Sequence, residues 1–182
     1  MRGRLGLREE VVNAFPNCFM IDSRNLDPDF KYLIASEPGG ENIKKCFSCG
    51  TCTAGCPVRE VTDRYNPRKI IRMAILGLKK EVLSSQFIWL CSSCYTCYER
   101  CPQNVKIPEL MNAIKNLAVR EGHLPPAMRT QLDLLASYGR LLEITDFENE
   151  KRKEMGLPLL PEKEEDVKKI LVKLGIHRGE KT

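Results

Sequence analysis

The sequence has no long hydrophobic run, and its apolar stretches are interrupted within a few residues. A transmembrane helix needs about 20 mostly apolar residues in a row, so none is predicted. The first ten residues, MRGRLGLREE, turn acidic where a secretory signal would need its apolar stretch. We therefore expect a soluble, cytoplasmic protein that makes no membrane contact.

Catalytic motifs are also missing. The sequence contains no glycine-rich loop for a dinucleotide or a phosphate, and no pattern that pairs a nucleophile with a base. Its two histidines, His123 and His177, fall in no ligand pattern. No catalytic residue is therefore assigned.

A run of lysines and arginines is absent too, although the formal net charge is +5. Residues 1–45 hold seven basic and seven acidic side chains, and residues 125–182 hold eleven of each. The whole excess lies in residues 46–124, which hold eleven basic and six acidic side chains. This distribution does not indicate a surface for nucleic acid.

Cysteine, in contrast, is abundant, with nine residues in the chain. Eight of them form two runs, CFSCGTCTAGCP (46–57) and CSSCYTCYERCP (91–102), which are offset by 45 residues. Both runs have the spacing C-x2-C-x2-C-x3-C-P. This spacing is typical of iron-sulfur proteins with two clusters, in which the fourth cysteine of each run ligates the other cluster.

Two equivalent halves can exchange their fourth cysteines, and we assign two sets of ligands for two 4Fe-4S clusters on that basis. The first cluster is assigned to Cys46, Cys49, Cys52 and Cys101. The second cluster is assigned to Cys91, Cys94, Cys97 and Cys56. Two oxidised clusters carry about two negative charges each, which would offset most of the basic excess around them.

Zinc and disulfides are the other uses that these cysteines allow. Zinc sites usually pair two C-x2-C knuckles across a loop, whereas here four cysteines fall within eleven residues, twice. The cytoplasmic location expected above disfavours disulfides. The ninth cysteine, Cys18, stands alone and is not assigned as a ligand, so an inert thiol and a redox or partner contact both stay open for it.

Helical patterns follow each cysteine run. Asn66 and Pro67 predict an N-cap and a first helical position, and the helix that they begin should end near Gly77. Pro108 opens a second helix after the second run. The apolar positions of the two helices are Ile70, Ile71, Ala74, Ile75 and Leu78, and Ile107, Leu110, Met111, Ile114, Leu117 and Ala118.

Hydroxyl residues repeat along with the cysteines. Ser48 and Thr51 of the first run recur as Ser93 and Thr96 of the second. Hydrogen bonds from such hydroxyls to cluster sulfur are one way in which a protein sets a reduction potential.

The C-terminal third carries no further chemistry. An irregular helical stripe follows Pro125 and Pro126, and a charged stretch spans residues 148–154. Pro161 predicts the start of a last helix, and its apolar face must pack on the chain's own core or on another subunit. The residues of that face are Val167, Ile170, Leu171 and Leu174.

Four segments give the chain a resemblance to a known family. They are GGENIKKCFSCGTCTAGCPV (39–58), YNPRKIIRMAILG (65–77), WLCSSCYTCYERCPQ (89–103) and EKRKEMGLPLLP (150–161). The chain resembles alpha-helical ferredoxin domains, and within them it is similar to the C subunits of heterodisulfide reductases from methanogenic archaea. The similarity extends from about residue 28 to the C-terminal end.

The resemblance implies an all-α fold and a place in a complex. It implies an N-terminal arm (1–29), a two-cluster ferredoxin domain (30–124) and a helical C-terminal extension that contacts other subunits (125–182). A flavin-containing subunit would supply electrons, with hydrogenase or formate dehydrogenase further upstream. The catalytic heterodisulfide reductase subunit would use them to reduce the heterodisulfide of coenzyme M and coenzyme B.

The expected function is therefore electron transfer by a non-catalytic subunit of an oxidoreductase. Both cysteine runs are complete, so no iron is left open for a substrate. The iron-sulfur subunit of another oxidoreductase, similar to succinate dehydrogenase or fumarate reductase, is the alternative. A zinc-stabilised interaction or nucleic-acid module is a more distant one.

Overall fold

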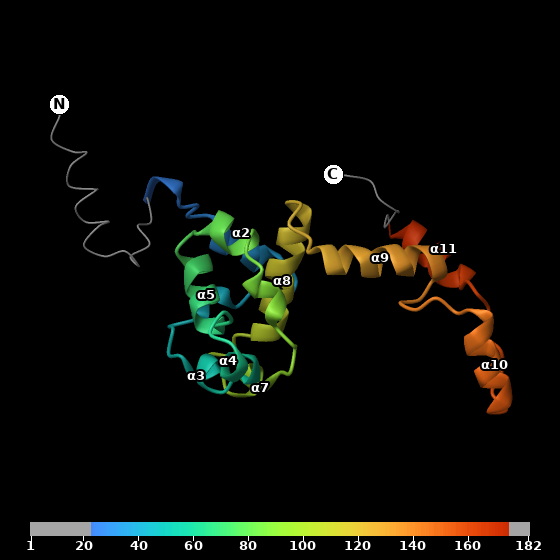
Figure 1. The fold of residues 1–182 in the computed structure, drawn as a ribbon. Coiled ribbons are helices and arrows are strands. Elements are labelled where there is room, and N and C mark those ends of the chain that lie inside the picture. Colours follow the sequence, from blue (N-terminus) through green and yellow to red (C-terminus); the bar gives the residue numbers. More distant parts are fainter. Residues whose placement is uncertain (1–22, 175–182) are drawn as a thin grey trace, which may run out of the picture. The chain divides into compact units, whose positions relative to one another are not determined.

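A computed structural model describes residues 23–174 of the chain (Figure 1). Every regular element in this range is a helix, which confirms the all-α class predicted from the sequence. None of the described helices is long and apolar enough to cross a membrane. The chain divides into two compact units, one ending at Ile114 and the other beginning at Lys115.

The first unit contains both cysteine runs and a set of short helices. Figure 1 shows α3, α4 and α7 grouped at one end of this unit. The elements are η1 (Ser23–Asn25), α2 (Phe30–Ser36), η2 (Ile43–Lys45), α3 (Thr51–Ala54), α4 (Pro57–Val61), α5 (Pro67–Ile75), α6 (Lys79–Leu83), η3 (Phe87–Leu90), α7 (Thr96–Glu99) and the start of α8 (Ile107–Arg120).

Helix α5 forms as the sequence predicts. Asn66 caps it by accepting a hydrogen bond from the backbone N–H of Lys69 at 3.0 Å, and Pro67 is its first residue. The helix ends at Ile75, and Gly77 follows with a φ of 85°, a left-handed conformation that suits glycine. Its buried residues are Pro67, Ile70, Ile71 and Ala74.

The two halves of the first unit repeat with a change of offset. Ile43 and Ile88, 45 residues apart, are both fully buried just before their cysteine runs. The buried residues Ile70 and Ile71 of α5 correspond instead to Leu110 and Met111 of α8, an offset of 40. The first half is longer because it contains α4 after its cysteine run, where the second half has only a turn.

The second unit contains α9 (Pro126–Tyr138), α10 (Asp146–Glu154) and α11 (Glu165–Lys173), of which α9 and α11 pack together. The prediction that Pro161 starts the last helix is wrong, since α11 begins at Glu165. The residue before it, Glu164, donates its backbone N–H to the carbonyl of Tyr138 at 2.9 Å and pairs its carboxylate with Arg140. These tertiary contacts hold the chain in a non-helical conformation up to residue 164.

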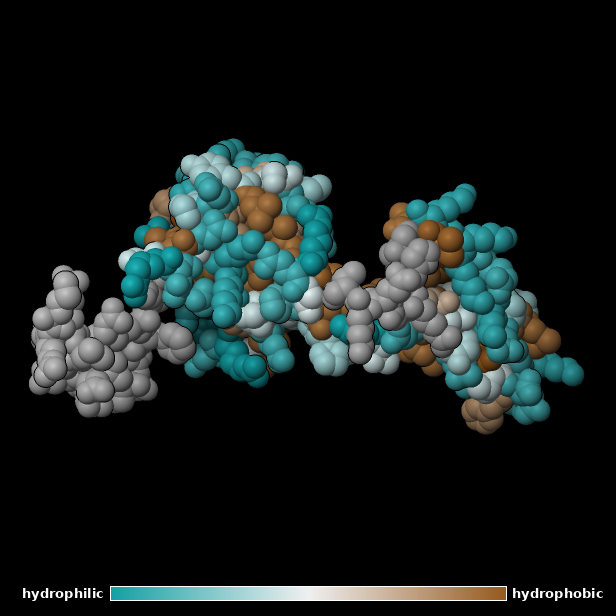
Figure 2. Space-filling view, turned by 90° about the horizontal axis from the view of Figure 1, so that it is seen from above, coloured by the Kyte–Doolittle hydropathy of each residue, from teal (hydrophilic) through white to brown (hydrophobic). Residues whose placement is uncertain are grey.

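The apolar face predicted for the last helix is only partly covered. Leu171 is buried and Val167 is half-buried, whereas Ile170 and Leu174 are exposed. Several other large apolar side chains of this unit, among them Phe147 and Met155, are also exposed. Brown hydrophobic surface is accordingly mixed with teal polar surface in Figure 2.

Candidate metal centres at the two cysteine loops

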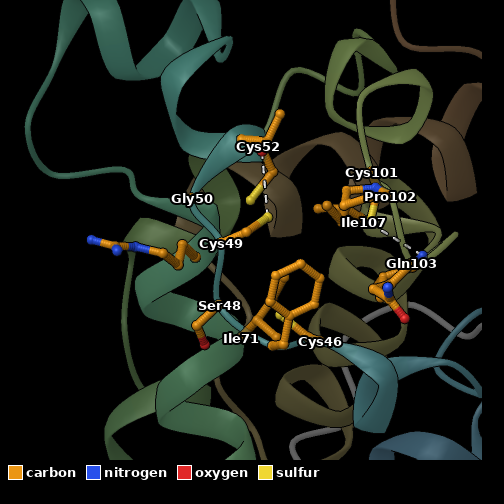
Figure 3. A pocket seen from close by; sticks show the side chains of 14 residues that line it. Cys46, Ser48, Cys49, Gly50, Cys52, Ile71, Cys101, Pro102, Gln103 and Ile107 are labelled. Carbon is orange, nitrogen blue, oxygen red and sulfur yellow. Dashed lines mark hydrogen bonds between the residues drawn. The ribbon is translucent and has the colours of Figure 1, made fainter.

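One hollow of the first unit brings together cysteines from both runs. Cys46, Cys49 and Cys52 of the first run and Cys101 of the second all line it, and Cys56 does not (Figure 3). The hollow contains about 350 Å³ of space, part of it open to solvent. These four thiols are the set assigned to the first cluster from the sequence.

The backbone of the first loop turns sharply around this hollow. Ser48 has a φ of 62° and Gly50 a φ of 89°. The second loop repeats this conformation 45 residues later, with a φ of 52° at Ser93 and 62° at Tyr95. A non-glycine residue adopts the left-handed conformation at a cost of about 1–2 kcal/mol. Such loops point backbone N–H groups into a concave site, an arrangement that many iron-sulfur sites use.

Matching hydroxyl groups contact the second cysteine of each run. The Sγ of Cys49 lies 3.4 Å from the Oγ1 of Thr51, and the Sγ of Cys94 lies 3.6 Å from the Oγ1 of Thr96. The side-chain hydrogen bond of each threonine is the main cause that lowers the pKa of its cysteine thiol, and the backbone N–H of the same threonine adds to it. The pairing predicted for these two threonines and sulfur atoms is therefore present in the structure.

The second set of thiols gathers around Cys97. Burial, followed by the charges of Cys91, Cys52, Cys94 and Cys56 in that order, raises the pKa of the Cys97 thiol to about 12. Three of these four neighbours are the residues assigned with Cys97 to the second cluster. The influence of Cys52, which belongs to the first set, indicates that the two sets are close to each other.

Tyr65 joins the second set, although the sequence did not single it out. Its side chain is only 2% exposed, and its hydroxyl is hydrogen-bonded to Cys91. Burial first and this hydrogen bond second raise the pKa of Tyr65 well above its usual range. Ser92 also hydrogen-bonds to Cys94 and is one of the causes that lower the pKa of that thiol. A tertiary contact of Tyr65 with Cys91, 26 residues away, leaves no local signal in the sequence.

Helix α5 supports the first loop through a small hydrogen-bond network. The Thr53 hydroxyl donates to the Asn66 side chain at 2.9 Å and accepts from the backbone N–H of Arg68 at 3.1 Å. Arg68 also lines the hollow that the four thiols bound. The network fixes the first turn of α5 against α3, the helix that carries Cys52.

The two serines singled out from the sequence behave differently from the threonines. The Ser48 hydroxyl is buried and finds no hydrogen-bond partner among the described residues. Figure 3 shows it pointing away from the cysteine sulfur atoms. Ser93 is exposed. Neither serine contacts sulfur as the threonines do, so their predicted role in setting a potential stays a prediction.

Of the other residues singled out from the sequence, the two histidines and Cys18, only His123 lies within the described part of the chain. His123 lies half-buried after α8, and Cys18 and His177 lie outside the described residues. The eight cysteines within residues 23–174 are free thiols. No group of three or more histidine, cysteine or carboxylate side chains in that range is close enough to hold a single metal ion.

Comparison with known proteins adds the chemistry of the relatives. Residues 42–105 match the family described as a 4Fe-4S dicluster domain. The chain is 37% identical to the C subunit of H2:CoB-CoM heterodisulfide,ferredoxin reductase from Methanothermobacter thermautotrophicus, over 86% of this chain and 87% of that protein. It is 38% identical to the iron-sulfur C subunit of CoB-CoM heterodisulfide reductase from Methanopyrus kandleri, over 80% and 79% of the two chains.

The chain belongs to the family of heterodisulfide reductase C subunits. The resemblance recognised in the sequence is thereby confirmed. A third relative, from Methanocaldococcus jannaschii, is 40% identical over 69% of this chain and 67% of its own. In this C subunit the dicluster match covers both cysteine runs, and the described thiols line a hollow whose donor chemistry suits 4Fe-4S clusters.

Proposed function

We propose that this protein binds two 4Fe-4S clusters and relays electrons between two other subunits of a heterodisulfide reductase complex. The first cluster is held by Cys46, Cys49, Cys52 and Cys101. The second is held by Cys91, Cys94, Cys97 and Cys56. Each cluster accepts and donates one electron at a time when it is bound.

The proposal rests chiefly on the composition of one hollow. Three cysteines of the first run and the last cysteine of the second run line it together, and the last cysteine of the first run does not. A site for a single run would have gathered all four cysteines of that run. The mixed set favours the exchange of fourth ligands between two clusters.

The second set supports the same arrangement less directly. The pKa of Cys97 is raised by the charges of Cys91 and Cys94 of its own run and of Cys56 of the other run. The pKa of Tyr65 is raised by the charges of cysteines from both runs, with Cys91 first, Cys56 next and Cys97 last. Both observations support the proposal that Cys56 belongs with the second set.

The protein groups around the thiols hold them in place and keep water from part of the site. Cys52 is only 7% exposed, and the fully buried Ile71 and the nearly buried Ile107 line the same hollow. Iron binding would also relieve the repulsion between thiolates that opposes ionisation of Cys97. Because the charge of Cys52 raises the pKa of Cys97 across the two sets, the two proposed clusters would lie close enough for electron transfer between them.

The partners follow from the relatives. Those proteins are named as C subunits of reductases for the CoB-CoM heterodisulfide, and one name also includes H2 and ferredoxin. We infer that this chain accepts electrons from the flavin-containing subunit of such a complex and passes them to its catalytic subunit. Hydrogenase or formate dehydrogenase would act upstream, and the complex would work in the cytoplasm.

Metal analysis and electron paramagnetic resonance of the anaerobically purified protein test the proposal. We expect about eight irons per chain, no stoichiometric zinc, and two reducible centres. Reduced protein mixed with the oxidised catalytic subunit should then lose its reduced-cluster signal as the catalytic subunit gains electrons. Zinc in place of iron, or clusters that no subunit of the complex can oxidise or reduce, would contradict the proposal.

A further inference from the structure

A second hollow lies beside that of the first thiol set and shares Ser48 and Arg68 with it. It is lined by residues of α5, of the segment that follows it and of the first cysteine loop, and it contains about 750 Å³, largely open to solvent. The lining residues are Ser48, Asn66, Arg68, Lys69, Arg72, Met73, Leu76 and Leu78. We refer to it as the α5 groove.

The rim of the α5 groove is positively charged. Arg68, Lys69 and Arg72 are exposed, and α5 contains no acidic residue. None of the described residues that line the groove is acidic. Within residues 23–174, neither Lys69 nor Arg72 forms an ion pair. These charges are therefore available to an anionic partner.

The floor of the groove is apolar. Leu76 is 45% exposed there, and the half-buried Met73 and the buried Leu78 lie with it. A highly charged small anion would leave this apolar surface uncovered. An amphipathic segment with acidic and apolar side chains would match both the rim and the floor.

The groove adjoins the candidate electron-transfer site. Ser48 and Arg68 line both the α5 groove and the hollow of the first thiol set. Ser48 lies between Cys46 and Cys49 in the sequence, and Cys49 is exposed. A segment bound in the groove would thus contact the loop that separates it from the first cluster site.

We propose that the α5 groove is the docking site for an acidic, amphipathic segment of the subunit that exchanges electrons with the first thiol set. The inference deepens the proposed relay function and rests on it. The chain's own ends are poor occupants, because residues 1–22 hold three basic and three acidic side chains and residues 175–182 are net basic. A second copy, with a net charge of +5, would also be repelled.

Binding of the iron-loaded protein to the purified flavin-containing and catalytic subunits, measured separately at low and moderate salt, tests the docking site. The variant Lys69→Glu places a carboxylate in the first turn of α5, where it favours the helix, so weaker binding would not reflect unfolding. We expect affinity for one of the two subunits to fall about tenfold, with a weaker dependence on salt. Arg72→Glu and Leu76→Gln should weaken the same interaction.

Lys80→Glu is the matched control. Lys80 is exposed, lies in the first turn of α6, and lines neither hollow. It makes the same change of charge and should leave both affinities within about twofold of the wild type. The iron content of each variant, compared with the wild type, verifies that the cluster sites are intact.

Unchanged affinity of Lys69→Glu and Arg72→Glu for both subunits would overturn the docking site. So would a result in which these variants only reduce self-association in sedimentation experiments, because a second copy would then be the occupant. An equal loss of affinity in Lys80→Glu would show that binding depends on general charge attraction and not on a specific groove. Failure of the relay function would show separately, as wild-type protein that binds its partner but holds no iron.

Discussion

The two cysteine loops share a backbone conformation but differ in the side chains that surround them. Both adopt left-handed conformations at the same two positions, and both place a threonine hydroxyl against their second cysteine. Where the first loop has Phe47 and Gly50, the second has Ser92 and Tyr95. Phe47 is 61% exposed, whereas Ser92 hydrogen-bonds to Cys94.

The shared backbone concerns how a cluster would be bound, whereas the differing side chains concern its reduction potential. The left-handed backbone is common to both loops and therefore to both proposed ligand sets. The additional sulfur contacts differ between the sets: the second set has the hydroxyls of Tyr65 and Ser92, whereas the first set has the Thr53 hydroxyl 4.0 Å from Cys52 and the Val105 N–H donating to Cys101 at 3.4 Å. Because hydrogen bonds to sulfur stabilise the more negative, reduced state, we expect each of these contacts to raise the potential of its own cluster.

Removing the iron should have the largest effect, and it should affect both loops equally. Each proposed cluster joins cysteines of both runs, so its loss leaves the first unit without the bonds that connect its halves. We expect rapid amide hydrogen exchange throughout α3, α5 and α7 after anaerobic chelation. The measurement is hydrogen exchange with mass spectrometry. Protection retained in one half only would show that the loops fold independently.

Substitutions at the equivalent positions Gly50 and Tyr95 should differ in cost. Gly50→Ala adds a Cβ at a φ of 89°, and since the nearest atom, Cδ of Arg68, would be 3.6 Å away, the cost is mainly backbone strain of about 1–2 kcal/mol. Tyr95→Gly relieves such strain but loses the edge-to-face contact with Tyr98, at 6.3 Å between ring centroids. We expect its net cost to be under about 1 kcal/mol.

Urea unfolding of the iron-loaded variants, followed by circular dichroism, measures both costs. A neutral Gly50→Ala variant would contradict the shared left-handed backbone at this position.

Tyr65→Phe should change the second cluster alone. The variant removes the hydroxyl that is hydrogen-bonded to Cys91 and keeps the buried ring. A hydrogen bond that stabilises the reduced cluster over the oxidised one by about 1 kcal/mol raises a one-electron potential by about 40 mV. Its loss should therefore lower the potential of the second cluster by that amount. Redox titration followed by electron paramagnetic resonance gives the potentials of both clusters.

Tyr98→Phe provides the control for this experiment, because Tyr98 has no described hydrogen bond to a thiol. Equal shifts in the potentials of both clusters in Tyr65→Phe would contradict the prediction that Tyr65 acts on the second cluster alone.

Ser92→Ala should produce a smaller shift in the same direction. The serine is the weaker of the two side-chain hydroxyls on Cys94, after Thr96, and it is exposed to water that can replace it. We expect the potential of the second cluster to fall by about 20 mV or less. Ser93→Ala, at the adjacent exposed position, should leave both potentials unchanged. A larger shift of the potential in Ser93→Ala than in Ser92→Ala would contradict the hydrogen bond of Ser92 to Cys94.

Features with a local cause could be predicted from the sequence. Asn66 and Pro67 start α5 because capping and a fixed φ act within one turn of the chain. The mixed thiol set could be predicted because the 45-residue repeat makes the two runs equivalent. The helical stripe after Pro126 likewise forms α9.

Features with a tertiary cause could not be predicted. The hydrogen bond of Tyr65 depends on the fold that brings α5 to the second run. Helix α11 starts at Glu165 and not at the predicted Pro161, because Glu164 hydrogen-bonds to the backbone of Tyr138 and pairs with Arg140. Helix α10 does have a local signal, because Thr145 and Glu148 form a capping box at the start of the stretch described above only as charged.

The exchange of the fourth cysteines is the central claim, and paired ligand variants test it most directly. Cys56→Ser should perturb the resonance signal and potential of the second cluster, whose other ligands are Cys91, Cys94 and Cys97, and leave the first cluster unchanged. Cys101→Ser should do the reverse. If Cys56→Ser instead damages only the cluster bound by Cys46, Cys49 and Cys52, each run binds its own cluster and the interlocked arrangement is wrong.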